Sequence, residues 1–224
     1  MNELPPDEPR WVQARAMLEA GTPTAGGAVI DDAAHLAVAL PGADPAALAA
    51  AIGPRRSWTL LVPTVDEAAA EAIQQALASH GWSGEAASLY AALASDDLAN
   101  DDGAAIAGDD RAALLAHVTD PALAAELSAA PGPLVAIAVE GVPAAFAYGA
   151  WRTARHVELT TQTLPAYRQL GLGVRVAAGL ARVELAQGRG PVMGALDSSA
   201  VAHRLANRIG LVEVARMRVL WSPA

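Results

Sequence analysis

The spacing of apolar and polar positions predicts alternating helices and strands in the first part of the chain. Apolar residues at helical spacing predict three helices, over 9–20, 44–52 and 66–80. Short apolar runs bounded by turn residues predict three strands, over 28–30, 36–40 and 58–62. Pro9 suits the first turn of a helix, and Asp44 and Asp66 suit N-caps. Residues 85–95 fit a helix or a strand equally well.

The second part of the chain has longer strand-like runs. Strands are predicted over 104–107, 134–139, 144–151, 157–163, 191–196 and 211–221. Helices are predicted over 109–117, 120–129, 173–187 and 198–209. Alternation within Val157–Thr163 places Glu158, Thr160 and Gln162 on one face of its strand. No internal sequence repeat is found.

A polar and acidic segment, Ser95–Gly103, is the best candidate for a linker. The chain has 224 residues, of which 53% are hydrophobic and 17% charged, so it can bury a sizeable core. We therefore expect an α/β subdomain over 1–99 and a second domain over 100–224. The long final strand, 211–221, suits an exposed sheet edge, where it would pair across a homodimer.

The composition excludes several classes of site. The chain has no cysteine, hence no disulfide, thiol nucleophile or cysteine zinc site, and we expect no metal. It has no lysine, hence no Walker-type phosphate lysine or Schiff base. A net charge of −9 and 4% aromatic residues disfavour nucleic-acid partners. No apolar stretch approaches the roughly 18 residues of a membrane span, and Met1–Arg10 is unlike a signal peptide, so we expect a soluble cytoplasmic protein.

Charge is divided unevenly along the chain. Residues 1–130 carry nineteen acids and five arginines, a net charge of −14, whereas residues 131–224 carry five acids and ten arginines, a net charge of +5. A basic second part suits an anionic ligand, and an acidic first part suits a cationic one. Mutual attraction of the two parts explains the pattern equally well.

The segment Arg168–Gly173 carries the most informative chemistry. It lies between a predicted strand and a predicted helix, and its glycines let the backbone approach a ligand closely. Free N–H groups at a helix start, together with the helix dipole, form an anion site. Val176 stands where the dinucleotide fingerprint needs its third glycine. Taken alone, these residues also fit a tight turn that starts a helix.

The longer string Thr163-Leu164-Pro165-Ala166-Tyr167-Arg168-Gln169-Leu170-Gly171-Leu172-Gly173 resembles the acetyl-CoA-binding motif of the GNAT superfamily of N-acetyltransferases. The ending Ile209-Gly210-Leu211 is similar to that of the family's next motif. The resemblance covers about 100–224 and is best over 157–211. It implies an α/β fold with a mixed, mostly antiparallel sheet flanked by helices, and splayed central strands. Some members pair a degenerate first half with an active second half, which the resemblance extends to 1–99.

The resemblance also implies which residues hold acetyl-CoA. Thr163 ends the strand, and the backbone of Leu164 would contact the pantetheine arm and the thioester carbonyl. The pyrophosphate would lie on the backbone N–H groups of Gln169, Leu170, Gly171, Leu172, Gly173 and Val174. Arg168 would reach a phosphate, although a surface arginine explains it nearly as well. Ser199, at the start of the next helix, stands where the family has a coenzyme-contacting asparagine.

Glu158 is the candidate general base, because related sequences often carry a glutamate on this strand and an amine must lose a proton to attack. An ion pair with Arg152 or Arg155 is the alternative explanation. His156 and His203 are further candidates for proton transfer. Three arginines recur every seven residues, and one of them would touch the coenzyme 3′-phosphate or else lie on a solvated face: Arg175, Arg182 and Arg189.

Two departures from the family pattern weaken the catalytic interpretation. Ala206 replaces the tyrosine that protonates the leaving thiolate in many members, and Ala202 replaces the usual serine. The sequence therefore predicts transfer of an acetyl group from acetyl-CoA to a primary amine of a small molecule or peptide, directly in a ternary complex. A degenerate, non-catalytic acyl-CoA-binding sensor is the alternative. The acceptor is not encoded in any recognisable motif.

Overall fold

The computed structural model describes residues 4–63, 66–92, 98, 105–107, 111, 115–116 and 118–224. Two compact units divide the chain: the first holds 1–89, 194–200 and 213–224, and the second holds 90–193 and 201–212. Most of the expected linker, and most of the helix expected over 109–117, lie outside the described residues.

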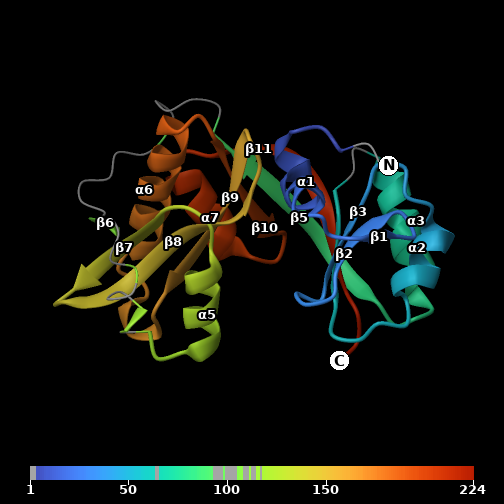
Figure 1. Ribbon diagram of the computed structural model, residues 1–224, viewed down its shortest axis with the longest axis horizontal. Helices are drawn as coiled ribbons and strands as arrows, with labels where there is room; N and C mark the ends of the chain where they lie inside the picture. The colour runs from blue at the N-terminus through green and yellow to red at the C-terminus, as the bar shows by residue number, and fades with distance from the viewer. Residues whose placement is uncertain are drawn as a thin grey trace. The chain divides into compact units, whose positions relative to one another are not determined.

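The first unit combines helices with a sheet (Figure 1). Its helices are η1 (Pro9–Trp11), α1 (Val12–Glu19), α2 (Pro45–Ile52) and α3 (Glu67–Ala78). Its strands are β1 (Thr24–Ala25), β2 (Ala28–Asp31), β3 (Leu36–Ala39), β4 (Thr59–Val62), β5 (Ser83–Ala91) and β11 (Val212–Trp221). They lie in the order β1-β2-β3-β4-β11-β5. β3 and β4 are parallel, whereas β1–β2, β2–β3 and β4–β11 are antiparallel.

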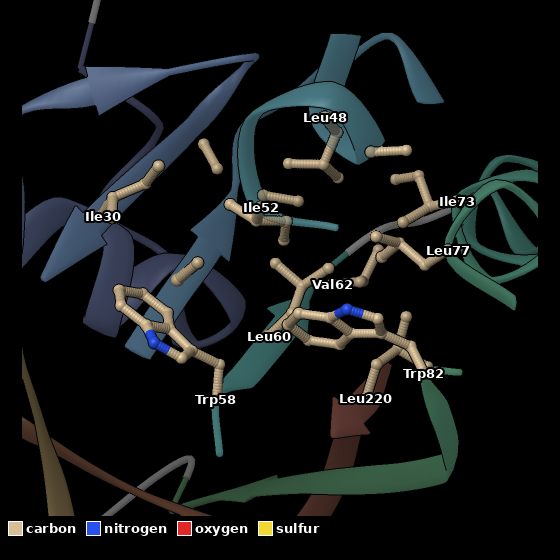
Figure 2. Packing of buried hydrophobic residues seen from close by; sticks show 14 of the residues in the cluster. Ile30, Leu48, Ile52, Trp58, Leu60, Val62, Ile73, Leu77, Trp82 and Leu220 are labelled. Carbon is tan, nitrogen blue, oxygen red and sulfur yellow. The ribbon is translucent and has the colours of Figure 1, made fainter. Parts of the chain in front are cut away.

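The core of the first unit lies between this sheet and the pair α2 and α3. Apolar residues spaced by a helical turn, such as Leu48 and Ile52, are fully buried there. Figure 2 shows these two side chains close to Ile73 and Leu77 of α3 and to Val62 of β4. Both helices start as their sequence predicts. Their N-cap carboxylates accept backbone N–H groups, that of Asp44 from Ala47 at 2.8 Å and that of Asp66 from Ala68 at 3.0 Å.

The second unit is built on the remaining strands and helices. Its strands are β6 (Ala105–Ala107), β7 (Leu134–Val139), β8 (Val142–Arg152), β9 (His156–Thr163) and β10 (Gly190–Leu196), whose last residues belong to the first unit. Its helices are α5 (Pro121–Ala129), η3 (Pro165–Tyr167), α6 (Leu172–Ala186) and α7 (Ala200–Arg208). The strands lie in the order β10-β9-β8-β7-β6, and β9 and β10 are the parallel pair.

Helices cover both faces of the second sheet. Leu127 of α5 packs with Leu134, Phe146 and Tyr148 on one face. α6 packs on β7, β8 and β9, and its Glu184 contacts Arg152 of β8. Strand alternation and the β8–β9 register place Arg152 and Tyr148 on opposite faces, since Tyr148 is paired with Thr160 and Arg152 with Val157. The α5 face therefore carries the alternating set that includes Glu158.

Most elements lie within a few residues of the predicted bounds, with two exceptions. The ambiguous segment 85–95 is a strand, β5, whose residues from Ala87 to Ala91 are all buried. Burial on both faces removes the alternation that would have identified it. The expectation that 211–221 forms an exposed edge is wrong. β11 lies between β4 and β5, and its last residues pair with β4 from Arg218↔Val62 to Trp221↔Thr59. Without an exposed edge, this strand no longer supports a homodimer, which stays an untested prediction.

Candidate functional site

The loop between β9 and α6 is fixed by backbone contacts at its start and left open at its end. The Leu164 N–H donates to the Ala144 carbonyl at 2.9 Å, which extends the β8–β9 ladder by one bond. The Tyr167 N–H donates to the Leu164 carbonyl at 2.9 Å, closing the short η3 turn. The Arg168 guanidinium is exposed, but its Nε donates to the Thr163 carbonyl at 3.3 Å. Arg168 therefore holds the loop onto the strand end.

Two residues of this loop have left-handed backbone conformations. Gln169 has φ 67°, and Gly171, the N-cap of α6, has φ 75°. Such values are easy for glycine and uncommon for other residues. They turn the chain so that α6 begins at Leu172, which is buried and anchors the helix start, whereas Leu170 is 61% exposed. A glutamine in this uncommon conformation indicates that contacts with neighbouring residues hold the backbone of the loop in place.

The backbone N–H groups from Gln169 to Val174 face no acceptor within the part of the chain that the structure describes. The first helical bond of α6 is Arg175 N–H to the Gly171 carbonyl, at 3.4 Å. A Cβ added to Gly171 would meet no heavy atom within 4 Å, and one added to Gly173 would meet the Thr163 Oγ1 at 3.5 Å. Successive donors at an uncovered helix N-terminus form a cradle that suits a diphosphate.

The parallel pairing of β9 with β10 stops before β9 reaches this loop. The register runs over three pairs and ends at Glu158↔Val192, although β9 continues to Thr163. From Leu159 onwards, among the residues of the second unit that the structure describes, β9 pairs with β8 alone. In α/β sheets, ligands commonly bind in a crevice beyond the carboxyl ends of the parallel strands. Glu158 is half-buried at the last paired position.

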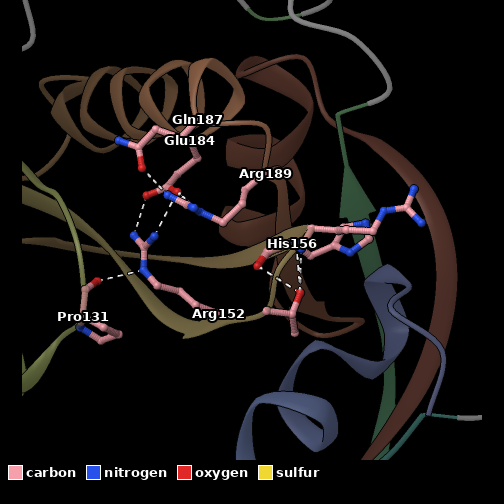
Figure 3. Close-up of polar contacts among 8 residues, drawn as sticks. Pro131, Arg152, His156, Glu184, Gln187 and Arg189 are labelled. Carbon is pink, nitrogen blue, oxygen red and sulfur yellow. Dashed lines mark hydrogen bonds and ion pairs between the residues drawn. The ribbon is translucent and has the colours of Figure 1, made fainter. Parts of the chain in front are cut away.

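Of the two alternative partners for Glu158, Arg152 is engaged elsewhere, whereas Arg155 stays an alternative. Arg152 donates through both terminal nitrogens to the carboxylate of Glu184, which is fully buried, with one bond at 3.0 Å, and through Nε to the Pro131 carbonyl at 2.8 Å. Arg189 Nε binds the same carboxylate at 2.8 Å (Figure 3). A coenzyme phosphate would have to compete with this buried carboxylate for Arg189, so Arg189 is a poor candidate for the 3′-phosphate.

A buried phenol lies on the Glu158 face of the sheet. Tyr148 is paired with Thr160, two residues along from Glu158, and its hydroxyl donates to the Glu126 carboxylate of α5. Burial, and then the hydrogen bond to Glu126, raise the pKa of Tyr148 far above its usual range, so the phenol keeps its proton. Sequence reasoning missed this pair, because nothing local links 126 to 148.

The other candidate residues have distinct environments. Ala206 is fully buried on α7, whereas His203, one turn earlier, is half-buried and its Nδ1 lies 2.8 Å from the Tyr90 hydroxyl of β5. Ser199 belongs to the first unit, where its N–H donates to the Leu196 carbonyl at 2.8 Å. His156 closes the β8–β9 turn: its carbonyl accepts from the Thr153 N–H at 2.9 Å, and its N–H donates to the Thr153 Oγ1 at 3.0 Å. The Tyr90–His203 contact joins distant segments and has no sequence signature.

In the part of the chain that the structure describes, no helix combines the length and the apolar character that crossing a membrane requires. Within the same residues, no group of histidine and acidic side chains is arranged to hold a metal ion.

Comparison with known proteins gives structural matches only. No protein-family model and no curated protein sequence matches the chain. A GCN5-related N-acetyltransferase from Kribbella flavida is 21% identical with a TM-score of 0.66, over 96% of this chain and 94% of its own. A structure described as a putative GNAT-family acetyltransferase from Novosphingobium aromaticivorans is 20% identical with a TM-score of 0.62, over 97% and 98%. A tandem GNAT protein from the clavulanic acid biosynthesis pathway is 12% identical with a TM-score of 0.51, over 95% and 94%. The expected architecture is confirmed: the chain has the fold of the GNAT N-acetyltransferases.

Proposed function

We propose that the protein is an acyltransferase that moves an acetyl group from acetyl-CoA to a primary amine of a small molecule or peptide, with both substrates bound together. One observation carries the proposal. The uncovered N–H groups from Gln169 to Val174 follow the end of β9, whose pairing with β10 stops at Glu158, five residues before β9 ends. GNAT-type structural neighbours support acetyl transfer as the chemistry.

The loop would hold acetyl-CoA mainly through its backbone. The six N–H groups from Gln169 to Val174, which no acceptor of the described residues occupies, could donate to the pyrophosphate oxygens. The positive end of the α6 dipole adds to the attraction. Leu164 and Thr163, at the end of β9, would meet the pantetheine arm. The Arg168 guanidinium, exposed beside the loop, adds a cation within reach of a phosphate. Fixing the thioester beside the acceptor would supply much of the rate through proximity.

The transfer step needs a base for the acceptor. An alkyl amine is an ammonium ion near neutral pH, and it attacks only after losing a proton. Glu158, directly or through one water, would take that proton, and the neutral nitrogen would then form a bond to the thioester carbon. The nitrogen of the tetrahedral adduct gives up a second proton to solvent water, the carbon–sulfur bond breaks, and the electron pair leaves on sulfur as the coenzyme thiolate. Direct transfer needs no covalent intermediate on the protein.

The face of the sheet around Glu158 suits a cationic acceptor. Glu158, Thr160 and the Tyr148–Glu126 pair share the α5 side of the second unit. Because the raised pKa of Tyr148 keeps its hydroxyl as a donor, the carboxylates of Glu126 and Glu158 supply the negative charge. An ammonium group is the partner that such a face attracts. The proposal is therefore an amine acceptor, with the identity of its remaining part open to a substrate panel.

Isothermal titration with acetyl-CoA tests the coenzyme site. We expect saturable binding that falls at least about 100-fold in Gly171→Glu, because bulk and negative charge enter the cradle. Gly42→Glu is the matched control: Gly42 also has a left-handed conformation, φ 73°, and a Cβ added there would meet no heavy atom within 4 Å, but it lies in the first unit. Equal affinities of wild type and Gly171→Glu would refute the site. Binding without acetylation of any amine in the panel would instead indicate a sensor.

A further inference from the structure

The Tyr90 hydroxyl and the His203 ring form a hydrogen-bonded pair in the second unit that the proposed transfer step does not use. Tyr90, on β5, is buried, and its hydroxyl oxygen lies 2.8 Å from Nδ1 of His203, which is half-buried on α7. The two rings meet edge to face, with centroids 5.8 Å apart and planes at 72°. These contacts fix the position of the imidazole and the nitrogen that it turns toward the phenol.

The second ring nitrogen of His203, Nε2, has no hydrogen-bond partner among the residues that the structure describes. In a neutral imidazole one nitrogen carries a proton and the other accepts a hydrogen bond. When the phenol donates to Nδ1, the ring proton lies on Nε2, because the bond made by one nitrogen selects the tautomer. The pair can therefore present an N–H donor while the ring stays neutral.

Tyr90 stands one strand away from the place where β9 and β10 separate. Two backbone bonds join β5 and β10 in antiparallel register, from the N–H of Ala92 to the carbonyl of Pro191 at 3.3 Å and from the N–H of Asp197 to the carbonyl of Ala86 at 2.9 Å. This register places Tyr90 opposite Met193. Met193 directly follows Val192, the last residue of β10 that is paired with β9.

The side chain of Tyr90 lies on the face of the sheet that α6 covers. Residues that are paired across two strands share a face, and so do alternate residues of one strand. Met193 thus shares its face with Pro191, which is paired with Val157 of β9. Val157 is in turn paired with Arg152, whose ion-pair partner belongs to α6. Because the histidine of α7 bonds to Tyr90, α7 lies on the same face as α6.

The candidate base and this donor therefore flank the separation of the strands from opposite faces. Glu158 is paired with Val192 and lies on the α5 face. The proposed cradle is at the start of α6, so the pantetheine arm would arrive on the α6 face and the acceptor on the α5 face. The sulfur joins the acetyl group to that arm. It would thus lie on the face that carries Tyr90 and His203.

We propose that the Nε2–H of His203 donates a hydrogen bond to the coenzyme sulfur as it leaves, and that Tyr90 is a positioning residue that holds the ring and selects its tautomer. The inference rests on the proposed function and names a further catalytic residue for it. As the carbon–sulfur bond breaks, both its electrons pass to sulfur, the Nε2 proton stays on nitrogen, and the coenzyme leaves as a thiolate. A preorganised donor aimed at a developing negative charge lowers the barrier.

The thiol of bound coenzyme A tests this proposal without an acceptor. The thiolate absorbs in the ultraviolet, so a pH titration of the complex, against the same protein with desulfo-coenzyme A, measures its acid dissociation constant. A donor beside sulfur favours the thiolate. We expect this constant to fall about tenfold in His203→Ala, because a hydrogen bond to a charged group is lost. Val201→Ala, at a 69% exposed position of the same helix, is the control and should leave the constant unchanged.

Two milder variants separate the donor from the packing of the ring. His203→Gln keeps an amide N–H near the place of Nε2, and we expect it to recover part of the lost thiolate. Tyr90→Phe keeps the aromatic ring but removes the bond to Nδ1. In this variant we expect the nitrogen chemical shifts of the His203 ring to change from one tautomer to a mixture, together with a smaller loss of thiolate.

Each outcome bears on a different claim. An unchanged acid constant in folded His203→Ala with coenzyme A bound, or an equal fall in Val201→Ala, would overturn the inference. If His203→Ala does not fold, unchanged ring shifts and an unchanged acid constant in Tyr90→Phe would overturn it. Calorimetry with coenzyme A precedes these titrations. Absence of binding by the wild-type protein would contradict the proposed function itself, so the two failures are distinguishable.

Discussion

The helices α2 and α6 follow the same Leu-Pro pair and yet start in opposite ways. α2 is capped by its own Asp44, whereas α6 has Gly171 at its N-cap and no side chain on its first amides. An N-cap side chain contributes about 0.5–2 kcal/mol to stability. One position of the fold thus serves stability in the first unit and leaves donors available in the second. The comparison teaches that an unfilled helix start is itself a functional signal.

The largest effect is expected from removing residues 1–99. β11 lies between β4 and β5, and this truncation deletes both neighbours. We expect fragment 100–224 to lose cooperative thermal unfolding by circular dichroism, because β11 would expose unpaired backbone groups and buried side chains such as Leu220. Co-expression of 1–99 with 100–224 is the control, and we expect it to restore a cooperative complex. A fragment 100–224 that melts cooperatively with undiminished coenzyme binding would contradict the need of β11 for its neighbours β4 and β5.

Glu158→Gln is expected to affect chemistry in the second unit alone. With an amine that gives turnover, we expect kcat to fall about 10²–10⁴-fold while coenzyme affinity stays within about twofold, because the carboxylate acts on the acceptor proton. Glu140→Gln, an exposed glutamate in the β7–β8 turn, is the control. An unchanged kcat in Glu158→Gln would show that this carboxylate is not the base.

Removing the buried carboxylate of Glu184 in the second unit should cost more stability than removing an exposed carboxylate in the first unit. Glu184 is fully buried between Arg152 and Arg189, so Glu184→Ala would leave two cations without their partner. We expect a loss of about 3–5 kcal/mol in the free energy of unfolding. Glu67→Ala in the first unit, which removes an exposed partner of Arg218, should cost at most about 1 kcal/mol. Chemical denaturation measures both, and equal losses would contradict this difference.

The sequence predicted the features that neighbouring residues determine. The caps Asp44 and Asp66 and the glycine loop before α6 depend on local backbone preferences, and all of them form. The placement of Glu158, Thr160 and Gln162 on one face followed from the period of a strand.

The missed features join residues far apart in the chain. The Glu184 network, the Tyr148–Glu126 pair and the Tyr90–His203 contact depend on which strands become neighbours. Apolar periodicity sets which face is buried but not the order of strands in a sheet, so it cannot place β11 between β4 and β5.

The smallest expected effect concerns the hydroxyl of Tyr148. Burial and the bond to Glu126 raise its pKa above the value of about 10 that an unfolded chain has. Its contribution to stability is therefore complete below about pH 10 and is lost as pH rises further, because only the unfolded state ionises readily. Tyr148→Phe should cost about 0.5–1.5 kcal/mol at neutral pH and show a weaker alkaline loss than wild type. Urea unfolding at several pH values measures the free energy of unfolding of both proteins. If that free energy fell equally with rising alkaline pH in wild type and Tyr148→Phe, a buried, neutral phenol on the α5 side of the second sheet would be refuted.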